Sequence, residues 1–194
     1  KRFLTELKYD GMAPTSIMFY KDVGHSQEGA KEVTKLLDAG AFEGPKPVRL
    51  LTRLLTLANL RDDSIVLDFF SGSATTAHAI MQMNVDKGRH VKYVMVQLPE
   101  SCDEKGTANK AGYNTICEIG KERIRRAGAK IKEEAGLTAQ NLDVGFRVLK
   151  CDTSNMKDVY YSPADFDMNL LDLMADNIKE DRSPEDLLFQ VMLD

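Results

Sequence analysis

The sequence lacks the features that define several common classes of protein. Its 194 residues contain no apolar run near the roughly 20 residues that a membrane-spanning helix needs, and no signal-peptide pattern opens the chain. The three cysteines, Cys102, Cys117 and Cys151, are odd in number and lack the C-x-x-C spacing of a zinc or redox site. These absences favour a cytoplasmic protein with no membrane segment and no metal centre.

An excess of positive charge is also missing. The chain has 26 Lys and Arg against 30 Asp and Glu, a net charge of −4, so it does not resemble a free-standing nucleic-acid-binding domain. Any contact with DNA would depend mainly on other parts of the protein. The composition, 43% hydrophobic and 29% charged residues, is that of a soluble globular domain with a real core.

Both ends of the sequence indicate a piece of a longer protein. It begins at Lys1 rather than at a methionine. Near the other end, Ser183, Pro184 and two acids have the pattern of a helix start, and the sequence stops at Asp194 soon afterwards. We therefore expect a fragment whose helical C-terminal segment is truncated.

The most informative stretch covers residues 65–80. An apolar run at 65–70 with a single carboxylate, Asp68, predicts a buried strand, and residues 75–83 have helical spacing. Between them lies a loop of small residues, 71–74. This order puts the loop's N–H groups at the positive end of a helix and Asp68 at the carboxyl end of a strand. Such a pocket suits a ligand that carries both an anionic and a cationic group.

Two familiar phosphate-binding loops do not match this stretch. No Lys follows the glycine, as a P-loop requires, and Gly72 is alone in the loop, so the dinucleotide spacing G-x-G-x-x-G is absent. The segment Asp68-Phe-Phe-Ser-Gly-Ser-Ala-Thr-Thr76 instead resembles the S-adenosylmethionine loop of DNA amino-methyltransferases, usually D-x-F-x-G-S-G-T-T. The methionine tail of that cofactor carries an amine and a carboxylate. The departure is Ala74, where many members have Gly, because alanine accommodates a helix start but not a positive φ.

A second motif lies upstream, at Phe42-x-x-Pro45-Lys46-Pro47. The two prolines fix φ, and Lys46 is extended because a proline follows it, so a rigid loop that begins the next helix would explain the pattern. The segment also resembles the one that precedes the cofactor loop in the same methyltransferases, where it lines the methionine side of the pocket. Two such motifs in this order are more specific than either alone.

Elsewhere the pattern predicts alternating helices and short strands. Helices are expected at 25–40, at 47–60 and from 113 to an end at Gly136, strands at 16–20, 91–96 and 144–149, and loops at 84–90 and 102–111. The strand at 91–96 would complete a right-handed βαβ unit with the central strand. The basic residues of the long helix, Arg123 among them, are expected largely off its apolar stripe, as a solvated face balanced by acids rather than a DNA-binding strip.

The end of the second strand offers two residues for the ribose hydroxyls of a cofactor. An acid commonly serves there in Rossmann-like folds. Here Gln97 comes first and Glu100 follows; the two are alternatives for this role, and a plain surface position would explain Glu100 equally well. The spelling Val96-Gln-Leu-Pro-Glu100 resembles the modification subunits of type III restriction–modification systems. So do Gly112–Ala127, Gly145–Asn155 and Asp176–Asp181.

This resemblance implies a fold class, α/β. It would be a partial, circularly permuted, Rossmann-like S-adenosylmethionine-dependent methyltransferase fold with a helical C-terminal extension. Residues 1–24 would end a preceding region, 25–155 would form the cofactor-binding half, and 156–194 the truncated helical segment. The family's expected partners are double-stranded DNA, a helicase-nuclease restriction subunit and a second copy of the methyltransferase.

The implied activity is methylation of adenine N6 by a β-class DNA methyltransferase. The family polarises the target amine with a D-P-P-Y motif, and the base must be flipped out of the duplex to reach it. No Pro-Pro pair occurs in this sequence. In the permuted class that motif precedes the cofactor loop, so we expect the fragment to contain no catalytic residue of its own and to be inactive alone.

The resemblance also implies roles for individual residues. Asp68 would engage the methionine amine, while the backbone of the loop and two of its hydroxyls would hold the carboxylate. The full set of expected cofactor-binding residues is Phe42, Lys46, Pro47, Asp68, Phe70, Ser71, Gly72, Ser73, Thr75, Gln97 and Glu100. Three alternatives remain open: an ordinary strand-to-helix turn on an unrelated sheet, a non-catalytic methyltransferase-like module that binds a protein partner, and a nucleotide-using enzyme of another Rossmann-like family.

Overall fold

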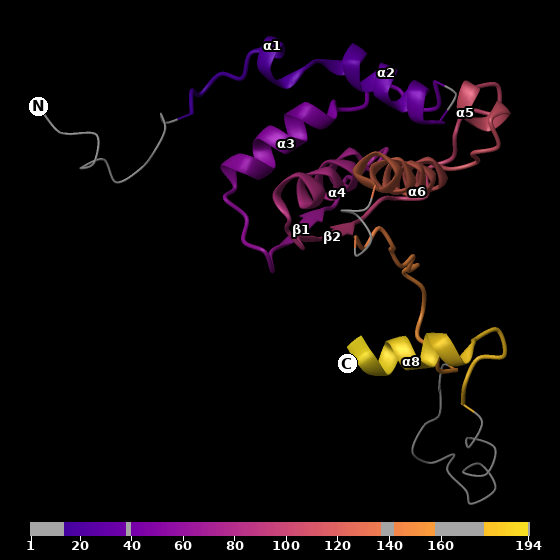
Figure 1. Cartoon of the computed structure of the whole chain (residues 1–194). Coiled ribbons are helices and arrows are strands. Elements are labelled where there is room, and N and C mark those ends of the chain that lie inside the picture. The colour runs from indigo at the N-terminus through magenta and orange to yellow at the C-terminus, as the bar shows by residue number, and fades with distance from the viewer. Residues whose placement is uncertain (1–13, 38–39, 137–141, 158–176, 194) are drawn as a thin grey trace, which may run out of the picture. The chain divides into compact units, whose positions relative to one another are not determined.

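The computed structural model describes residues 14–37, 40–136, 142–157 and 177–193 (Figure 1). Contacts divide the chain into two compact units, residues 1–146 and 147–194. The first unit carries both sequence motifs, and each unit is considered separately below. The finer division at residues 24 and 155 remains a prediction.

The centre of the first unit is a βαβ arrangement, as the sequence predicts. Strand β1 (Ile65–Asp68) and strand β2 (Lys92–Met95) pair in parallel, with Asp68 opposite Met95. Helix α4 (Thr75–Lys87) connects them. The chain therefore has the α/β character expected, with Asp68 as the last residue of its strand.

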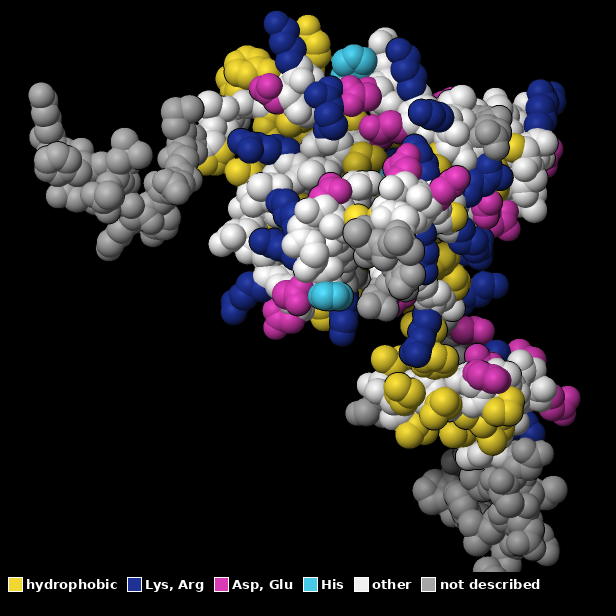
Figure 2. Space-filling view, viewed as in Figure 1, with side chains coloured by type: hydrophobic (Ala, Val, Ile, Leu, Met, Phe, Trp, Pro, Cys, Tyr) yellow, Lys and Arg dark blue, Asp and Glu magenta, His cyan; other side chains and the backbone are white. Residues whose placement is uncertain are grey.

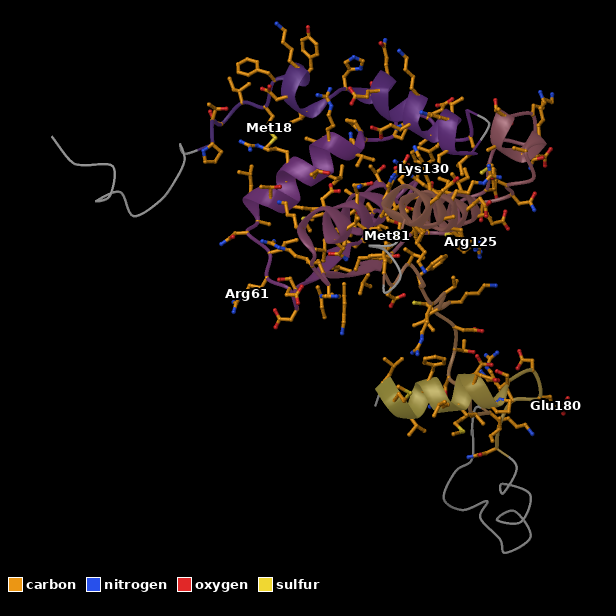
Figure 3. The ribbon with its side chains drawn as sticks, viewed as in Figure 1. Met18, Arg61, Met81, Arg125, Lys130 and Glu180 are labelled. Carbon is orange, nitrogen blue, oxygen red and sulfur yellow. The ribbon has the colours of Figure 1, made fainter. Side chains whose placement is uncertain are left out.

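Helix α4 is buried on nearly all sides. Its side chains at 77, 79, 80, 81 and 83 have at most 2% of their surface exposed. One side packs with α6 (Ile116–Ala135) through Met81, Ile124 and Ala127, and another packs with α3 (Val48–Leu57) through Ile80 and Leu55. Figure 3 labels Met81 where α4 and α6 meet. The apolar side chains of α4 thus face two neighbouring helices, and this packing on both sides stabilises the helix.

The other helices surround this core. Helix α2 (Ser26–Leu37) contacts α6 through Val33 and Ile119. Helix α6 begins at a capping box: the Thr115 side chain accepts the backbone N–H of Glu118, and the Glu118 side chain accepts the backbone N–H of Thr115. The smaller elements of this unit are α1 (Tyr20–Val23) and α5 (Thr107–Lys110). No helix in the described residues combines the length and apolar character needed to cross a membrane.

One face of the small sheet remains open. Ile65, Leu67 and Val94 have 65%, 59% and 48% of their surface exposed, whereas the alternate residues Val66 and Tyr93 pack toward α4. Parallel sheets are normally covered on both faces. Next to this sheet, between α3 and β1, lies an apolar groove of about 460 Å³.

Several predicted elements differ from the structure. Residues 144–149 do not form a strand; Val144 and Phe146 instead pack as irregular chain against the core beside α6. The predicted edge strand at 16–20 is also wrong, because the chain turns into α1 at Tyr20. Neither segment pairs with a strand in the described residues, and outside Val144 and Phe146 their large apolar side chains are mostly exposed, Ile17, Phe19 and Leu149 among them. The predicted loop at 84–90 is mostly helix, and that at 102–111 contains α5.

The second unit contains α8 (Pro184–Leu193). Ser183 and Asp186 exchange hydrogen bonds at its start: the Asp186 carboxylate accepts from the Ser183 N–H at 2.8 Å, and the Ser183 hydroxyl accepts from the Asp186 N–H at 3.3 Å. This confirms the predicted helix start. Exposed apolar side chains gather on α8 (Figure 2), including Leu188, Val191 and Met192. Ser162-Pro163 also has the sequence pattern of a helix start, and it lies outside the described residues.

Candidate functional site

The site begins at the carboxyl end of β1, where Asp68 is held in a fixed orientation. Its Oδ1 accepts a hydrogen bond from the Phe70 N–H at 3.2 Å, and its Oδ2 accepts one from the Thr76 hydroxyl at 2.5 Å. The carboxylate is partly exposed. A negative charge is thus positioned beside the loop with acceptor capacity left for a ligand, since a carboxylate has about four lone-pair sites.

The loop after β1 is a tight turn tied to the neighbouring strand. The Ser71 N–H donates to the Val96 carbonyl at 3.1 Å, and the Ala74 N–H donates back to the Ser71 carbonyl at 2.7 Å. Gly72 has φ +52°, a left-handed conformation that glycine adopts without steric cost. The turn therefore leads directly into α4, and its N–H groups at Ser71 and Ala74 are satisfied within the protein.

Ala74 is also left-handed, with φ +59° and ψ +38°. The expectation that alanine would hold a helix-start conformation here is therefore wrong. The reason lies in its packing: Ala74 is 2% exposed, and its methyl group lies in the core formed with Ala77 and Ile124. Burial of the methyl group offsets part of the cost of a left-handed alanine, which is roughly 1–2 kcal/mol.

We expect Ala74→Gly to leave the free energy of unfolding within about 0.5 kcal/mol of the parent. Relief of the left-handed conformation, roughly 1–2 kcal/mol, offsets the loss of a buried methyl and the greater entropy of the unfolded chain. Ala77→Gly is the control, because this fully buried alanine has an ordinary helical backbone. It should cost about 2 kcal/mol from helix propensity and the lost methyl. Equal losses for both variants in urea unfolding would contradict this account.

The upstream motif lies against the same loop. Pro45 and Pro47 are buried, Lys46 is exposed, and Pro47 is the residue that caps α3. Helix α2 holds the segment from behind, because Glu32 accepts the Val48 N–H at 3.0 Å. The Phe42 ring reaches the loop itself: a Cβ added to Gly72 would lie 3.1 Å from its Cζ. Two motifs more than 20 residues apart therefore meet in space.

Together the two motifs line a cavity of about 240 Å³. Eight of the eleven predicted residues contribute to its walls: Phe42, Lys46, Asp68, Phe70, Ser71, Gly72, Ser73 and Thr75. Gly44, Pro45, Leu51 and Thr76 complete the walls. The cavity combines a carboxylate, an exposed lysine, hydroxyls and aromatic rings. Pro47, Gln97 and Glu100 do not line it.

Gln97 acts on the loop rather than on the cavity. Its Oε1 accepts the Gly72 N–H at 2.8 Å, so the amide bridges the end of β2 and the turn. Glu100 is exposed, and its carbonyl accepts the Ile116 N–H at the start of α6. The structure therefore gives Gln97 a structural partner, while the assignment of either residue to a ribose remains a prediction.

Sequence reasoning missed Arg123, which lies directly beneath the loop. It is fully buried, and its Nη1 donates to the Ser73 hydroxyl at 2.9 Å and to the Thr75 hydroxyl at 2.7 Å. Its position was predicted to lie off the apolar stripe of α6, which is wrong. Gly120 and Ala127 stand three residues before and four after it, so the spacing placed it on the stripe. The helical spacing of the residues around it was therefore the signal in the sequence that Arg123 is buried.

Burial governs the electrostatics of this cluster. It lowers the pKa of Arg123 to about 10 and raises the pKa of Glu32, whose Oε2 lies 3.8 Å from Nη2 of the arginine. Three other basic residues of α6 are balanced by acids, as predicted: Arg125 and Arg126 pair with Glu122, and Lys130 with Glu134 (Figure 3 labels Arg125 and Lys130). Among the described residues no cluster of His, Cys, Asp or Glu has the arrangement of a metal site.

Comparison with known proteins places the chain among DNA methylases. The family model for N6 and N4 DNA methylases matches residues 10–132. The Mod subunit of the type III restriction-modification enzyme StyLTI, from Salmonella typhimurium LT2, is 41% identical over 129 residues, 66% of this chain and 19% of that protein. The EcoPI Mod subunit of Escherichia phage P1 is 36% identical over 136 residues, 70% of this chain and 20% of that protein.

The EcoP15I Mod subunit of Escherichia coli is 38% identical over 107 residues, 55% of this chain and 15% of that protein. The chain thus spans about a fifth of the length of these curated relatives or less. The matched region contains both motifs, β1, β2 and most of α6. The chain belongs to the DNA methylase family.

Proposed function

We propose that this chain is the S-adenosylmethionine-binding part of a type III modification methyltransferase, which methylates adenine N6 at specific DNA sites in the cytoplasm. The observation that carries the proposal is the convergence of residues 42–47 and 68–76 on one cavity, with Asp68 fixed at its edge. The amine of a methionine tail would bind Asp68, and its carboxylate would lie against the hydroxyls of Ser73 and Thr75, because the N–H groups of Ser71, Gly72 and Ala74 already have acceptors within the protein. Phe42 and Phe70 would provide apolar walls for the rest of the cofactor.

The finer fold assignment belongs to the same proposal. A circularly permuted Rossmann-like sheet would continue beyond β1 and β2, with residues 25–155 as its cofactor half and 156–194 as a helical extension. The exposed face of Ile65, Leu67 and Val94 supports this reading, because a parallel sheet of two strands with a bare apolar face is incomplete as a domain. The complete protein would bind double-stranded DNA, pair with a second copy and assemble with a helicase-nuclease subunit.

The chemistry expected of this part is alignment of the donor. Methyl transfer from a sulfonium is a displacement in which the enzyme chiefly holds donor and acceptor in line. The residues of this chain would orient the methionine end through Asp68 and the loop, while a D-P-P-Y motif elsewhere in the protein would hold the flipped adenine. This chain alone would bind the cofactor without transferring the methyl group.

A thermal-shift experiment on the 194-residue chain tests the proposal. S-adenosylmethionine at one hundred times its Kd should stabilise the fold by roughly 2.7 kcal/mol, whereas NAD and ATP should have no effect. Asp68→Asn should weaken binding at least tenfold, about 1.4 kcal/mol, because the amine loses its carboxylate partner. Asp63→Asn, at an exposed acid just before β1, is the control and should bind as the parent does.

The outcomes separate the proposal from its rivals. Stabilisation by NAD or ATP instead would favour a nucleotide-using enzyme. If no cofactor stabilises the chain, the protein-binding module becomes the better reading, with the apolar face of α8 as its natural surface. Unchanged S-adenosylmethionine binding in Asp68→Asn would overturn the role of the acid.

A further inference from the structure

The strongest feature that the proposed function leaves unused is the buried Arg123. Its side chain is completely inaccessible, yet its Nε and Nη2 have no hydrogen-bond partner among the described residues. Its Nη1 alone is satisfied, by the hydroxyls of Ser73 and Thr75. A buried cation with two unpartnered donors is costly, and such a feature persists where it serves something besides stability.

The hydrogen bonds of Arg123 determine how the hydroxyls of Ser73 and Thr75 can donate their own protons. A guanidinium only donates, so both hydroxyl oxygens must accept from it. Each hydroxyl then has one proton left to donate. The two oxygens are 3.5 Å apart, so one hydroxyl can donate to the other, but both cannot do so at once. At least one proton is therefore available to an acceptor in the cavity, which Ser73 and Thr75 both line.

The charge of Arg123 is only partly compensated. Glu32 is the acid nearest to it, and the 3.8 Å separation of Oε2 and Nη2 exceeds a hydrogen bond. The same Oε2 accepts the Val48 N–H, and 26% of the Glu32 side chain is exposed. In a low-dielectric interior the remaining positive potential is felt strongly at the loop, one hydroxyl away. The cavity floor is thus electropositive, opposite the negative charge of Asp68.

We propose that Arg123 is the positioning residue that makes this cavity select a carboxylate. It holds Ser73 and Thr75 as outward hydrogen-bond donors and places a positive charge beneath them. This proposal rests on the proposed function, since the carboxylate concerned is that of the methionine tail. The two charged groups of the methionine tail are then recognised separately. Asp68 binds the amine, and the hydroxyls positioned by Arg123 bind the carboxylate.

The test compares two ligands that differ only at the carboxylate. The affinity of the full chain for S-adenosylmethionine and for its decarboxylated analogue is measured by calorimetry, and the ratio of the two Kd values reports carboxylate selection. The parent chain should prefer S-adenosylmethionine at least tenfold. Arg123→Met should bring the ratio close to one, by weakening S-adenosylmethionine while leaving the analogue nearly unchanged. Arg123→Lys, which keeps the charge, should restore part of the preference.

Two further variants keep the test decisive. Arg125→Met removes an exposed arginine from the same helix and should retain the parent ratio. Thr75→Val removes one hydroxyl while preserving the shape of the side chain, and should lower the ratio even if Arg123→Met does not fold. A parent-like ratio in Arg123→Met would overturn the inference. Where Arg123→Met does not fold, a parent-like ratio in Thr75→Val would overturn it. Failure of the parent chain to bind S-adenosylmethionine would instead overturn the proposed function.

Discussion

Gly29→Ala is expected to lower the free energy of unfolding by about 3 kcal/mol, at the upper end of overpacking effects. Gly29 lies inside α2, where alanine would ordinarily stabilise the helix by about 1 kcal/mol. Here a Cβ would lie 2.2 Å from the Pro45 carbonyl oxygen and 2.9 Å from the Lys46 carbonyl carbon. The obstacle is backbone, and Pro45 cannot yield easily because its ring fixes φ. Either α2 or the proline-containing segment must move.

The same displacement should weaken cofactor binding, because Pro45 and Lys46 form one wall of the cavity. Gly40→Ala is the matched control, since its Cβ would meet nothing nearer than the Thr34 Oγ1 at 4.0 Å. Urea unfolding of both variants measures the difference, and calorimetry with S-adenosylmethionine measures the effect on the cavity. If Gly29→Ala were as stable as Gly40→Ala, the close contact between α2 and the cavity wall would not exist as described.

The local part of the site was predictable from sequence because it is encoded locally. An apolar run, a small-residue loop and a helical period follow one another within residues 65–83, and the structure has β1, the turn and α4 in that order. The contact between this loop and Phe42 came from a resemblance between motifs. Physical reasoning on the residues alone predicted only a rigid loop before α3.

The rest depended on contacts that sequence patterns do not specify. Val144 and Phe146 have strand-forming character, but they pack on the core beside α6 and pair with neither strand of the sheet. Ala74 adopts a left-handed backbone that its residue type disfavours, because the surrounding core fixes its methyl group. Arg123 was assigned by its charge to the surface, although its spacing placed it inside. In each instance tertiary packing overrode the local preference.

The burial of Arg123 bears on function. A charged residue on the apolar stripe of a helix contradicts the pattern on both sides of it, and such contradictions concentrate at functional or strained sites. Helix α6 approaches the loop closely at this point: a Cβ added to Gly120 would lie 3.2 Å from the Gly72 carbonyl oxygen. The glycine lets the helix approach, and the arginine one turn later reaches under the turn. Both residues of α6 therefore serve the geometry of the loop.

The second large effect is expected with acid, and it arises at His78 on α4. This histidine is partly buried, and its Nδ1 has no hydrogen-bond partner among the described residues. Burial, with the positive charges of Arg123 and Lys130, lowers its pKa to about 4. The folded state thus keeps His78 neutral where the unfolded state, with a pKa near 6.5, binds a proton. The free energy of unfolding is therefore unaffected by His78 above pH 6.5, and it decreases as the pH falls from 6.5 toward 4.

The loss over this range should reach about 3 kcal/mol, at 1.36 kcal/mol for each pKa unit. His78→Asn, which cannot be protonated, should flatten the dependence between pH 6.5 and 5, before most carboxylates titrate. The control is His25→Asn, which replaces an exposed histidine by the same residue. Urea unfolding at half-unit steps of pH measures all three proteins. If the free energy of unfolding depended on pH in the same way in the parent and in His78→Asn, His78 would be solvated in the folded state. The burial described for α4 around this residue would then be wrong.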